Sequence, residues 1–278
     1  MTPSSALVVG TGLVGTSVAL ALTARGVRVL LTDRDPDAVR VARERGAGRP
    51  WDGERVDVVV LAMPPQYVAD RLASLQWCDA GDVYTDVASV KVDPIRAAER
   101  RGCDLSRYVP GHPIAGGERS GPAAARADLF RGRPWALCPT ARTSPDALAK
   151  VRALVELCGG RVVITEAAQH DGAMALISHA PHVMATAVAA RLVDAPGLAV
   201  GLAGQGLRDT TRIAAGDPAL WREILSRNAG PVADVLTAIA GDLHEMAEAL
   251  RGGRPDVVTE LLREGVTGRR RITAPSAN

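Results

Sequence analysis

The sequence is poor in aromatic residues, in lysines and in paired cysteines. Its 278 residues include one Phe, three Tyr and four Trp, so aliphatic side chains must form most of the core. The four cysteines, at positions 78, 103, 138 and 158, form no CxxC pair, which argues against a zinc knuckle. The net charge is only +2, and basic residues gather only at 269–271. This pattern excludes a nucleic-acid-binding footprint.

A secretion signal and a membrane anchor are also missing from the pattern. The N-terminus, "MTPSSALVVG", has no basic segment followed by an apolar run, and the apolar stretches elsewhere are too short or too interrupted to span a bilayer. The 47% apolar and 23% charged composition is that of a soluble globular protein. We therefore expect a cytoplasmic protein with reduced thiols, and its length favours two domains.

A glycine-rich loop near the N-terminus predicts a dinucleotide site. The apolar run "ALVV" at 6–9 is followed by "GTGLVG" and then by an apolar helical stretch that ends at Gly26. A G-x-G-x-x-G loop between a strand and a helix places unpaired N–H groups of the helix N-terminus against phosphates. In this interpretation Gly10 allows the tight turn, Gly12 lets the backbone approach the pyrophosphate, and Gly15 allows close helix packing.

An acidic residue follows the next strand and indicates which dinucleotide is bound. The strand at 27–33 ends in Asp33, where a carboxylate can accept hydrogen bonds from ribose hydroxyls. We expect NAD rather than NADP, because this carboxylate would repel a 2′-phosphate, although Arg34 beside it carries the opposite charge. The expected cofactor contacts are Gly10, Gly12, Leu13, Val14, Gly15, Asp33, Met63 and Pro64.

Strands and helices alternate through the first 165 residues. Further strands are predicted at 57–64, at 81–89, within "RYVPGHP", at 134–140 and at 161–165, with helices between them that start at Asp93–Pro94 and Ser144–Pro145. The alternation predicts a parallel, Rossmann-type sheet. Ligands bind at the carboxyl ends of such strands, so three residues that each lie just past a strand should gather there, namely Ser89, Lys91 and His112.

The segment "GHPIAGGERSG" at 111–121 has neither helical nor strand periodicity. Pro113 biases His112 toward extended angles, and the glycines let the chain turn, which predicts a loop that carries an imidazole. Such a loop could present a catalytic base. It could equally be a plain turn with an exposed histidine.

Helices dominate after residue 165, so we place a domain boundary between 1–165 and 166–278. The stretch 169–193 reads as one long apolar helix interrupted by His170, Asp171, Ser178, His179 and His182. His179 and His182 share a face, whereas His170 should lie near the opposite side, which argues against one metal coordination sphere. These histidines are either core residues satisfied by the backbone or a patch that faces the substrate.

The next helices carry two arginines and a tryptophan. Arg208 and Arg212 should share one face of a helix that ends at Gly216, before an Asp217–Pro218 helix start. Arg212 is either a solvated cation or the bidentate partner of a substrate carboxylate, and a tryptophan at a helix start usually serves packing. An amphipathic helix at 229–250 and a weaker one at 256–264 should lead into a frayed basic tail.

The order of six motifs resembles the prephenate and arogenate dehydrogenases of tyrosine biosynthesis. They are "GTGLVG", "VLAMPP", "DVASVK", "GHPIAGGERSG", "HDGAMALISHAPH" and "GLRDTTRIAAGDPALWREILSRN". The resemblance implies a catalytic His112 assisted by Ser89. It also implies a pocket in which His182 lies and Arg212 binds a carboxylate, with Ser178 and Trp221 as further candidates. Ala88 replaces a common glycine and Gly117 a common Thr or Ser, which leaves the substrate open.

The activity implied by this resemblance is the NAD-dependent oxidative decarboxylation of prephenate by a homodimer that pairs through its helical domain. His112 would accept the hydroxyl proton, with an acid limb near the ordinary histidine pKa of about 6.5. No metal is required, and no regulatory ACT domain is expected in this chain. Arogenate and 4-amino-4-deoxyprephenate remain alternative substrates.

Two rival functions follow from the same fold class. A β-hydroxyacid dehydrogenase would need a lysine in the helical domain, and the sequence has none after Lys150. A non-catalytic NAD-sensing protein would have no need of His112, Ser89 and Arg212 together. Oxidation assays with the three candidate substrates would separate an enzyme from a sensor.

Overall fold

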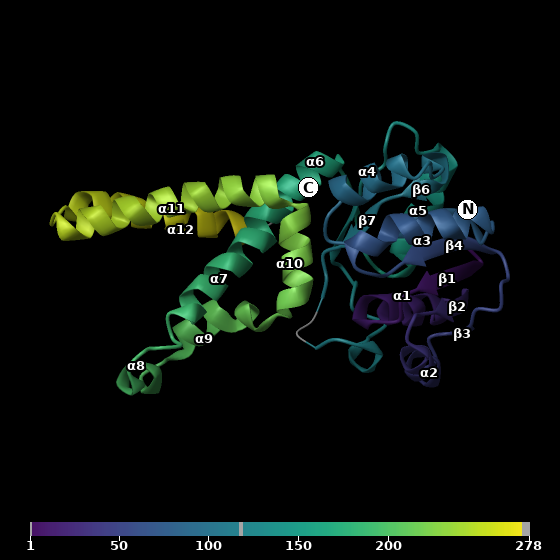
Figure 1. Ribbon diagram of the computed structural model, residues 1–278, viewed down its shortest axis with the longest axis horizontal. Coiled ribbons are helices and arrows are strands. Elements are labelled where there is room, and N and C mark those ends of the chain that lie inside the picture. Colours follow the sequence, from purple (N-terminus) through teal and green to yellow (C-terminus); the bar gives the residue numbers. More distant parts are fainter. Residues whose placement is uncertain (1, 117–118, 274–278) are drawn as a thin grey trace. The chain divides into compact units, whose positions relative to one another are not determined.

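The computed structural model describes residues 2–116 and 119–273, and its first half is a parallel sheet covered by helices on both faces (Figure 1). The sheet has the order β3-β2-β1-β4-β5-β6 with parallel pairing throughout, which confirms the predicted Rossmann-type domain. Its strands are β1 (Ser5–Val9), β2 (Arg28–Thr32), β3 (Arg49–Pro50), β4 (Val56–Leu61), β5 (Gly81–Asp86) and β6 (Tyr108–Val109).

The strands are apolar on both sides because both sides are buried. Along β1, Ala6 and Val8 pack in the same core as α1 and α5, whereas Leu7 and Val9 pack in the core that contains α3 and α4. The helices of this half are α1 (Leu13–Thr23), α2 (Pro36–Glu44), α3 (Pro65–Trp77), α4 (Val92–Arg100) and α5 (Pro145–Leu157), with short 3₁₀ turns η1 (Leu105–Arg107) and η2 (Pro122–Ala124).

A second, three-stranded sheet corrects the prediction of a single parallel one. It consists of β7 (Gly111–Pro113), β8 (Pro134–Leu137) and β9 (Arg161–Ile164), with β7 antiparallel to β8. His112 therefore lies on a short strand opposite Ala136 and not in a loop. The backbone of Gly111 passes so close to β5 that a Cβ there would lie 2.8 Å from the carbonyl oxygen of Asp86. The rest of the segment includes Gly117, which lies outside the described residues.

The start of α4 also differs from the expectation. Asp93 was expected to cap this helix, but the N-cap residue is Lys91, and Asp93 pairs instead with Arg227. The backbone N–H groups of Lys91 and Val92 donate to the two carboxylate oxygens of Asp171, at 2.8 and 2.9 Å. The cap thus comes from a residue 80 positions away, which no local pattern can reveal.

The helical segment that follows is α6 (Ala167–Met174), a π-helical turn η3 (Ala175–His179), α7 (Ala180–Ala190), α8 (Gly197–Gly201), α9 (Gln205–Thr211), the 3₁₀ turn η4 (Arg212–Ala215) and α10 (Pro218–Arg227). Asp217 caps α10 with its side chain, as predicted. The wider π turn ends two residues before Pro181, which lacks a backbone N–H. It changes the angular spacing between His170 and His179, which the prediction of opposite sides took from a regular α-helix.

One helical stretch, Ala167–Ala190, is long and apolar enough to span a membrane by length and composition alone, with a mean hydropathy of 1.3. The expectation that every apolar stretch is too short or too interrupted to span a bilayer is corrected by this helix. Core helices of globular proteins meet the same criterion, and the polar residues His170, Asp171 and His179 inside this stretch are buried and hydrogen-bonded within the protein.

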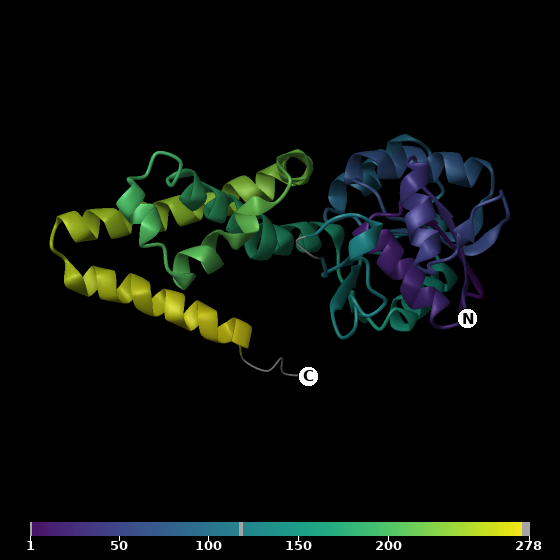
Figure 2. The same cartoon turned by 90° about the horizontal axis from the view of Figure 1, so that it is seen from below.

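By its internal contacts the chain divides into two compact units, residues 1–229 and 230–278. The second unit contains most of α11 (Ala229–Arg251) and all of α12 (Pro255–Thr273), between which the chain reverses direction at Gly252–Gly253 (Figure 2). The prediction of a frayed tail is wrong for the residues up to Thr273, because α12 continues through the three consecutive arginines. The functional boundary at 165/166 remains a prediction.

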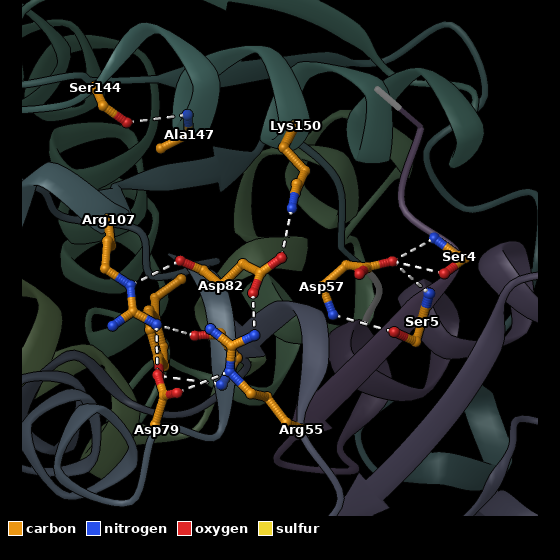
Figure 3. A network of polar contacts seen from close by, with 12 residues as sticks. Ser4, Ser5, Arg55, Asp57, Asp79, Asp82, Arg107, Ser144, Ala147 and Lys150 are labelled. Atoms are coloured by element: carbon orange, nitrogen blue, oxygen red, sulfur yellow. Dashed lines mark hydrogen bonds and ion pairs between the residues drawn. The ribbon is translucent and has the colours of Figure 1, made fainter.

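Charged residues at the amino ends of β4 and β5 form a polar network (Figure 3). Arg55 and Arg107 both donate to Asp79, at 2.8 and 2.9 Å, and their hydrogen bonds lower the pKa of that carboxyl. Lys150 donates to Asp82 at 2.8 Å. One of the two lysines is therefore engaged at the edge of the sheet that faces away from the strand carboxyl ends.

Candidate active site

The glycine loop leaves room for a ligand at one position and none at two others. A Cβ on Gly10, whose φ is +102°, would overlap the carbonyl oxygen of Ala62, and a Cβ on Gly15 would overlap that of Gly10. A Cβ on Gly12 would meet nothing within 4 Å. Gly12 is the N-cap of α1 and brings no capping side chain, so the N–H groups of the first turn remain available to an anion. This geometry fits a pyrophosphate.

Asp33 stands directly after β2 and ties the loop to the sheet. Its Oδ2 accepts hydrogen bonds from the backbone N–H and, at 3.0 Å, the hydroxyl of Thr11, and its Oδ1 accepts one from the N–H of Asp35. Oδ1, which accepts only this one hydrogen bond among the described residues, has a second lone pair to offer. Arg34 is exposed. The carboxylate is thus fixed at the end of the strand, where it could also receive ribose hydroxyls.

The remaining predicted cofactor residues flank this loop. Leu13 and Val14 form the first turn of α1 and are partly buried, and Val14 packs on the core. Met63 and Pro64 follow β4, the neighbour of β1, and Pro64 is exposed at the start of α3. All four lie at the carboxyl ends of adjacent strands, the edge at which ligands of such sheets bind.

A buried ion pair supports the end of β5. Lys91 is fully buried, and its Nζ donates to Asp86 Oδ1 and to the carbonyl oxygen of Gly111. The same carboxylate accepts from the Ala88 N–H at 2.8 Å and from the Tyr108 hydroxyl at 2.6 Å. Lys91 therefore does lie beside the His112 strand as expected, but it points inward and fixes the backbone instead of facing the cofactor edge.

His112 lies in a row of three polar side chains. Its Nδ1 is 2.9 Å from His170 Nε2, and His170 Nδ1 is 2.8 Å from Asp171 Oδ1. His170 and Asp171 are on α6 and are almost completely buried, whereas His112 is partly buried. The strand β7 and the helix α6, which are far apart in sequence, thus meet at the candidate base.

Burial, with a smaller effect of neighbouring titratable groups, keeps His112 neutral. Desolvation is the main cause that holds its pKa well below the ordinary histidine value, and His170, Lys91 and His179 add to the effect. A neutral imidazole can accept a proton at neutral pH. The expected acid limb near pH 6.5 therefore moves to lower pH.

His179 is fixed by Asn228, the residue that follows α10. The amide of Asn228 donates to the backbone carbonyl of Asp171 at 2.7 Å and lies 3.0 Å from His179 Nδ1. Burial lowers the pKa of His179 to about 4. Since an amide N–H donates here, the Nδ1 atom of His179 is the acceptor, and this histidine is a neutral structural link between α6 and the end of α10.

The rings of His182 and Trp221 stack on each other, and one ring nitrogen of His182 has no hydrogen-bond partner among the described residues. Their rings are 3.6 Å apart and inclined by 9°. His182 is 6% exposed, and its Nδ1 has no hydrogen-bond partner among the described residues. Gly216 closes on this pair, since a Cβ there would lie 2.5 Å from Trp221 Nε1 and 3.2 Å from His182 Cε1. A buried, unpartnered ring nitrogen points to a ligand that supplies the missing partner.

The other predicted site residues lie on the segments around these groups. Ser89 is partly buried in the turn between β5 and α4, two residues before Lys91. Ser178 is partly buried in the π turn. Arg212 is exposed and begins η4, which packs on the helix of His182. The structure thus places Arg212, His182 and Trp221 on neighbouring elements.

Four residues of this region were not expected to have a site role. Asp86, Tyr108, Asp171 and Asn228 each form hydrogen bonds that hold a site segment in place. For Asp171 the sequence did contain a signal. Two adjacent titratable residues in an apolar helix, His170 and Asp171, need hydrogen-bond partners when they are buried. Asn228 carried no such signal.

Comparison with known proteins settles the family. Residues 18–164 match the sequence model of the prephenate dehydrogenase nucleotide-binding domain, and residues 166–264 match that of the prephenate dehydrogenase dimerization domain. The chain belongs to the prephenate dehydrogenase family. It is therefore an oxidoreductase, which confirms the resemblance seen in the six motifs, and it contains the dimerization domain of the family.

Relatives within the family differ in their substrates. The chain is 40% identical to the probable prephenate dehydrogenase NovF of Streptomyces niveus, over 96% of this chain and 77% of that protein. A crystal structure of prephenate dehydrogenase from Aquifex aeolicus with hydroxyphenyl propionate and NAD⁺ has a TM-score of 0.87 and 28% identity, covering 97% and 98% of the two chains. Synechocystis arogenate dehydrogenase has a TM-score of 0.80 and 28% identity, covering 99% and 100%.

Proposed function

We propose that this enzyme oxidises and decarboxylates prephenate to 4-hydroxyphenylpyruvate with NAD⁺ as the acceptor. The observation that carries the proposal is the neutral His112, held beside the carboxyl edge of a dinucleotide-binding sheet in a chain of this family. The similar prephenate dehydrogenases, one of them with NAD⁺ and a hydroxyphenyl ligand bound, support the choice of substrate and cofactor.

The proposed chemistry needs one base and one carboxylate clamp. Prephenate carries a ring hydroxyl and loses the hydrogen at the same carbon, together with its ring carboxylate. NAD⁺, when bound, supplies the hydride acceptor. His112 accepts the hydroxyl proton as the hydride leaves. The bond to the ring carboxylate then breaks to release CO₂, its electron pair makes the ring aromatic, and the proton returns to the phenolate oxygen. Aromatisation makes the step favourable. Ser89, close to the end of β5, assists at the hydroxyl.

The segment after residue 165 binds the substrate. Arg212 binds a substrate carboxylate through charge-assisted hydrogen bonds, and the unpartnered Nδ1 of His182 supplies a polar contact beside Trp221. Ser178 on the π turn is a further contact. We accordingly propose that residues 1–165 bind the dinucleotide and that 166–278 bind substrate and pair the subunits, in an enzyme of the cytoplasm.

The catalytic efficiency should be highest for prephenate with NAD⁺. The Asp33 carboxylate, fixed by Thr11, would repel the 2′-phosphate of NADP⁺. Steady-state oxidation of prephenate, arogenate and 4-amino-4-deoxyprephenate, each with NAD⁺ and with NADP⁺, measures both preferences as ratios of kcat/KM.

The same assay separates the alternatives. A higher kcat/KM with NADP⁺ would show that the cofactor assignment is wrong. Arogenate carries an amino group in place of the side-chain keto group of prephenate, and a preference for it would group this enzyme with the Synechocystis relative. Inactivity with all three substrates, while NAD⁺ still binds, would indicate the non-catalytic sensor.

We also propose that the enzyme is a homodimer. Several large apolar side chains of the helical segment are exposed in a single chain, among them Leu176 at 60% and Ile177 at 61%. The match of this segment to a dimerization domain supports pairing through it. Sedimentation equilibrium at micromolar concentration should give twice the chain mass of 29.0 kDa. A mass of one chain would exclude a stable homodimer.

A further inference from the structure

The row His112–His170–Asp171 connects the candidate base to a helix N-terminus. The two imidazole rings meet edge to face, with centroids 5.1 Å apart and planes inclined by 74°, so one ring nitrogen of His112 is aimed at one of His170. His170 in turn uses its other ring nitrogen toward Asp171. Which nitrogen of His112 carries a proton therefore depends on the state of Asp171.

Asp171 is placed to act only as an acceptor. Its Oδ1 accepts the N–H of Lys91 and its Oδ2 that of Val92, at the first residues of the nine-residue helix α4. The positive end of a helix dipole favours an anion in this position. An ionised carboxylate has no proton to give, so the hydrogen in the 2.8 Å contact with His170 belongs to His170 Nδ1.

The positions of the remaining protons follow from the proton on His170 Nδ1. A neutral His170 with a proton on Nδ1 has a lone pair on Nε2, so the 2.9 Å contact must contain a proton on His112 Nδ1. The Nε2 of His112 is then the lone pair. We propose that His170 and Asp171 are positioning residues that hold His112 in its Nδ1–H tautomer and so make Nε2 the base. This inference rests on the role of His112 in the proposed function.

The charged and titratable groups around His112 agree with this arrangement. Lys91 on the β5–α4 connection is paired with Asp86 and donates to the carbonyl oxygen of the residue before His112. His179 on the π turn faces Asn228 as a hydrogen-bond acceptor. If His170 were an imidazolium instead, both its nitrogens would donate, His112 would carry its proton on Nε2, and it could not accept another there.

Nitrogen-15 NMR of the histidine side chains tests the tautomer without any turnover. The chain has only five histidines, so each imidazole can be assigned by replacing it in turn. We expect His112 in the intact enzyme to show a protonated Nδ1 and an unprotonated Nε2 near neutral pH. His170 should show the same pattern. A protonated Nε2 on His112 would overturn the proposal.

Three substitutions test the positioning role in kinetics. His170→Asn cannot reach His112, and Asp171→Asn has only one oxygen with which to accept these donors. Neither variant should hold His112 in the Nδ1–H tautomer. Each should lower kcat by more than tenfold, up to the roughly 10⁴-fold that the wrong tautomer costs. His170→Gln places an amide oxygen where Nε2 was, keeps the Nδ1–H tautomer, and should lose less than about tenfold. KM should change little in all three.

Two controls separate positioning from stability. Ser144→Ala removes the side-chain cap of α5, at a distance from His112. Like Asp171→Asn it weakens a helix cap, but it should leave kcat unchanged. In the double variant His112→Asn/His170→Asn, the second substitution should cost no further activity, because it acts only through His112. A full additional loss in the double variant would overturn the proposal.

Failure of this inference and failure of the proposed function give different results. If the enzyme is inactive with every candidate substrate, the NMR spectrum still reports the tautomer of His112. If the enzyme oxidises prephenate but His112 carries its proton on Nε2, or if His170→Asn is as active as the intact enzyme, the proposed function stands and the positioning role is refuted.

Discussion

Replacing His112 by Asn should lower kcat by about 10²- to 10⁴-fold, the usual cost of losing a general base. The variant should still fold, because His112 is a partly buried residue on a three-residue strand and contributes little to either core. It should also bind NAD⁺ as tightly as the intact enzyme, since the glycine loop and Asp33 are untouched. Stopped-flow kinetics and a cofactor titration measure the two quantities separately.

The pH dependence gives this prediction a second measurement. Only the neutral imidazole can accept a proton, and burial holds the pKa of His112 well below its ordinary value of about 6.5. The rate of the intact enzyme should thus stay constant down to about pH 6.5 and fall only at lower pH, and the residual rate of the variant should lack this acid limb. His244→Asn, which removes an exposed histidine, is the matched control. A kcat within threefold of the intact enzyme would show that His112 is not the base, and His182 would be the next candidate.

Replacing Arg212 by Ala should raise KM for prephenate by about 10- to 150-fold, which corresponds to the roughly 1.5–3 kcal/mol of a hydrogen bond to a charged group. The reason is the loss of a guanidinium that binds a substrate carboxylate with two parallel N–H groups. NAD⁺ affinity should not change, because Arg212 lies on η4 and not on the cofactor loop.

Arg208→Ala is the matched control for this substitution. Arg208 is also exposed and lies on α9, four residues earlier, so its removal changes the net charge equally. We expect its KM to match that of the intact enzyme. Weaker NAD⁺ binding in Arg212→Ala with an unchanged KM would mean that the arginine serves the cofactor instead.

The features that could be predicted from sequence are those encoded by neighbouring residues. The strand at 5–9, the loop Gly10–Gly15 and the following helix form one continuous pattern, and each glycine has the tight or open surroundings that the pattern requires. The caps Ser144 and Asp217 were visible for the same reason, since the backbone N–H groups that donate to their side chains lie only two or three residues away.

The features that were missed depend on residues far apart in the chain. The cap of α4 comes from Asp171, so the local candidate Asp93 was a reasonable but wrong choice. The strand of His112 is too short to show any periodicity and exists because Trp135 and its neighbours on β8 pair with it. The π turn shifts the histidines of the long helix relative to one another, and a helical wheel with a constant angle cannot represent that.

The carboxylate of Asp171 has a consequence for the engineering of this enzyme. It belongs to the helical segment, yet it completes a helix of the Rossmann sheet, and Asn228 binds the backbone of the same residue from the far end of that segment. The nucleotide-binding half is therefore not an interchangeable module. A chimera that joined this sheet to the helices of another dehydrogenase would need both Asp171 and Asn228. Without them the first N–H groups of α4, two residues after Ser89, would lose their acceptor.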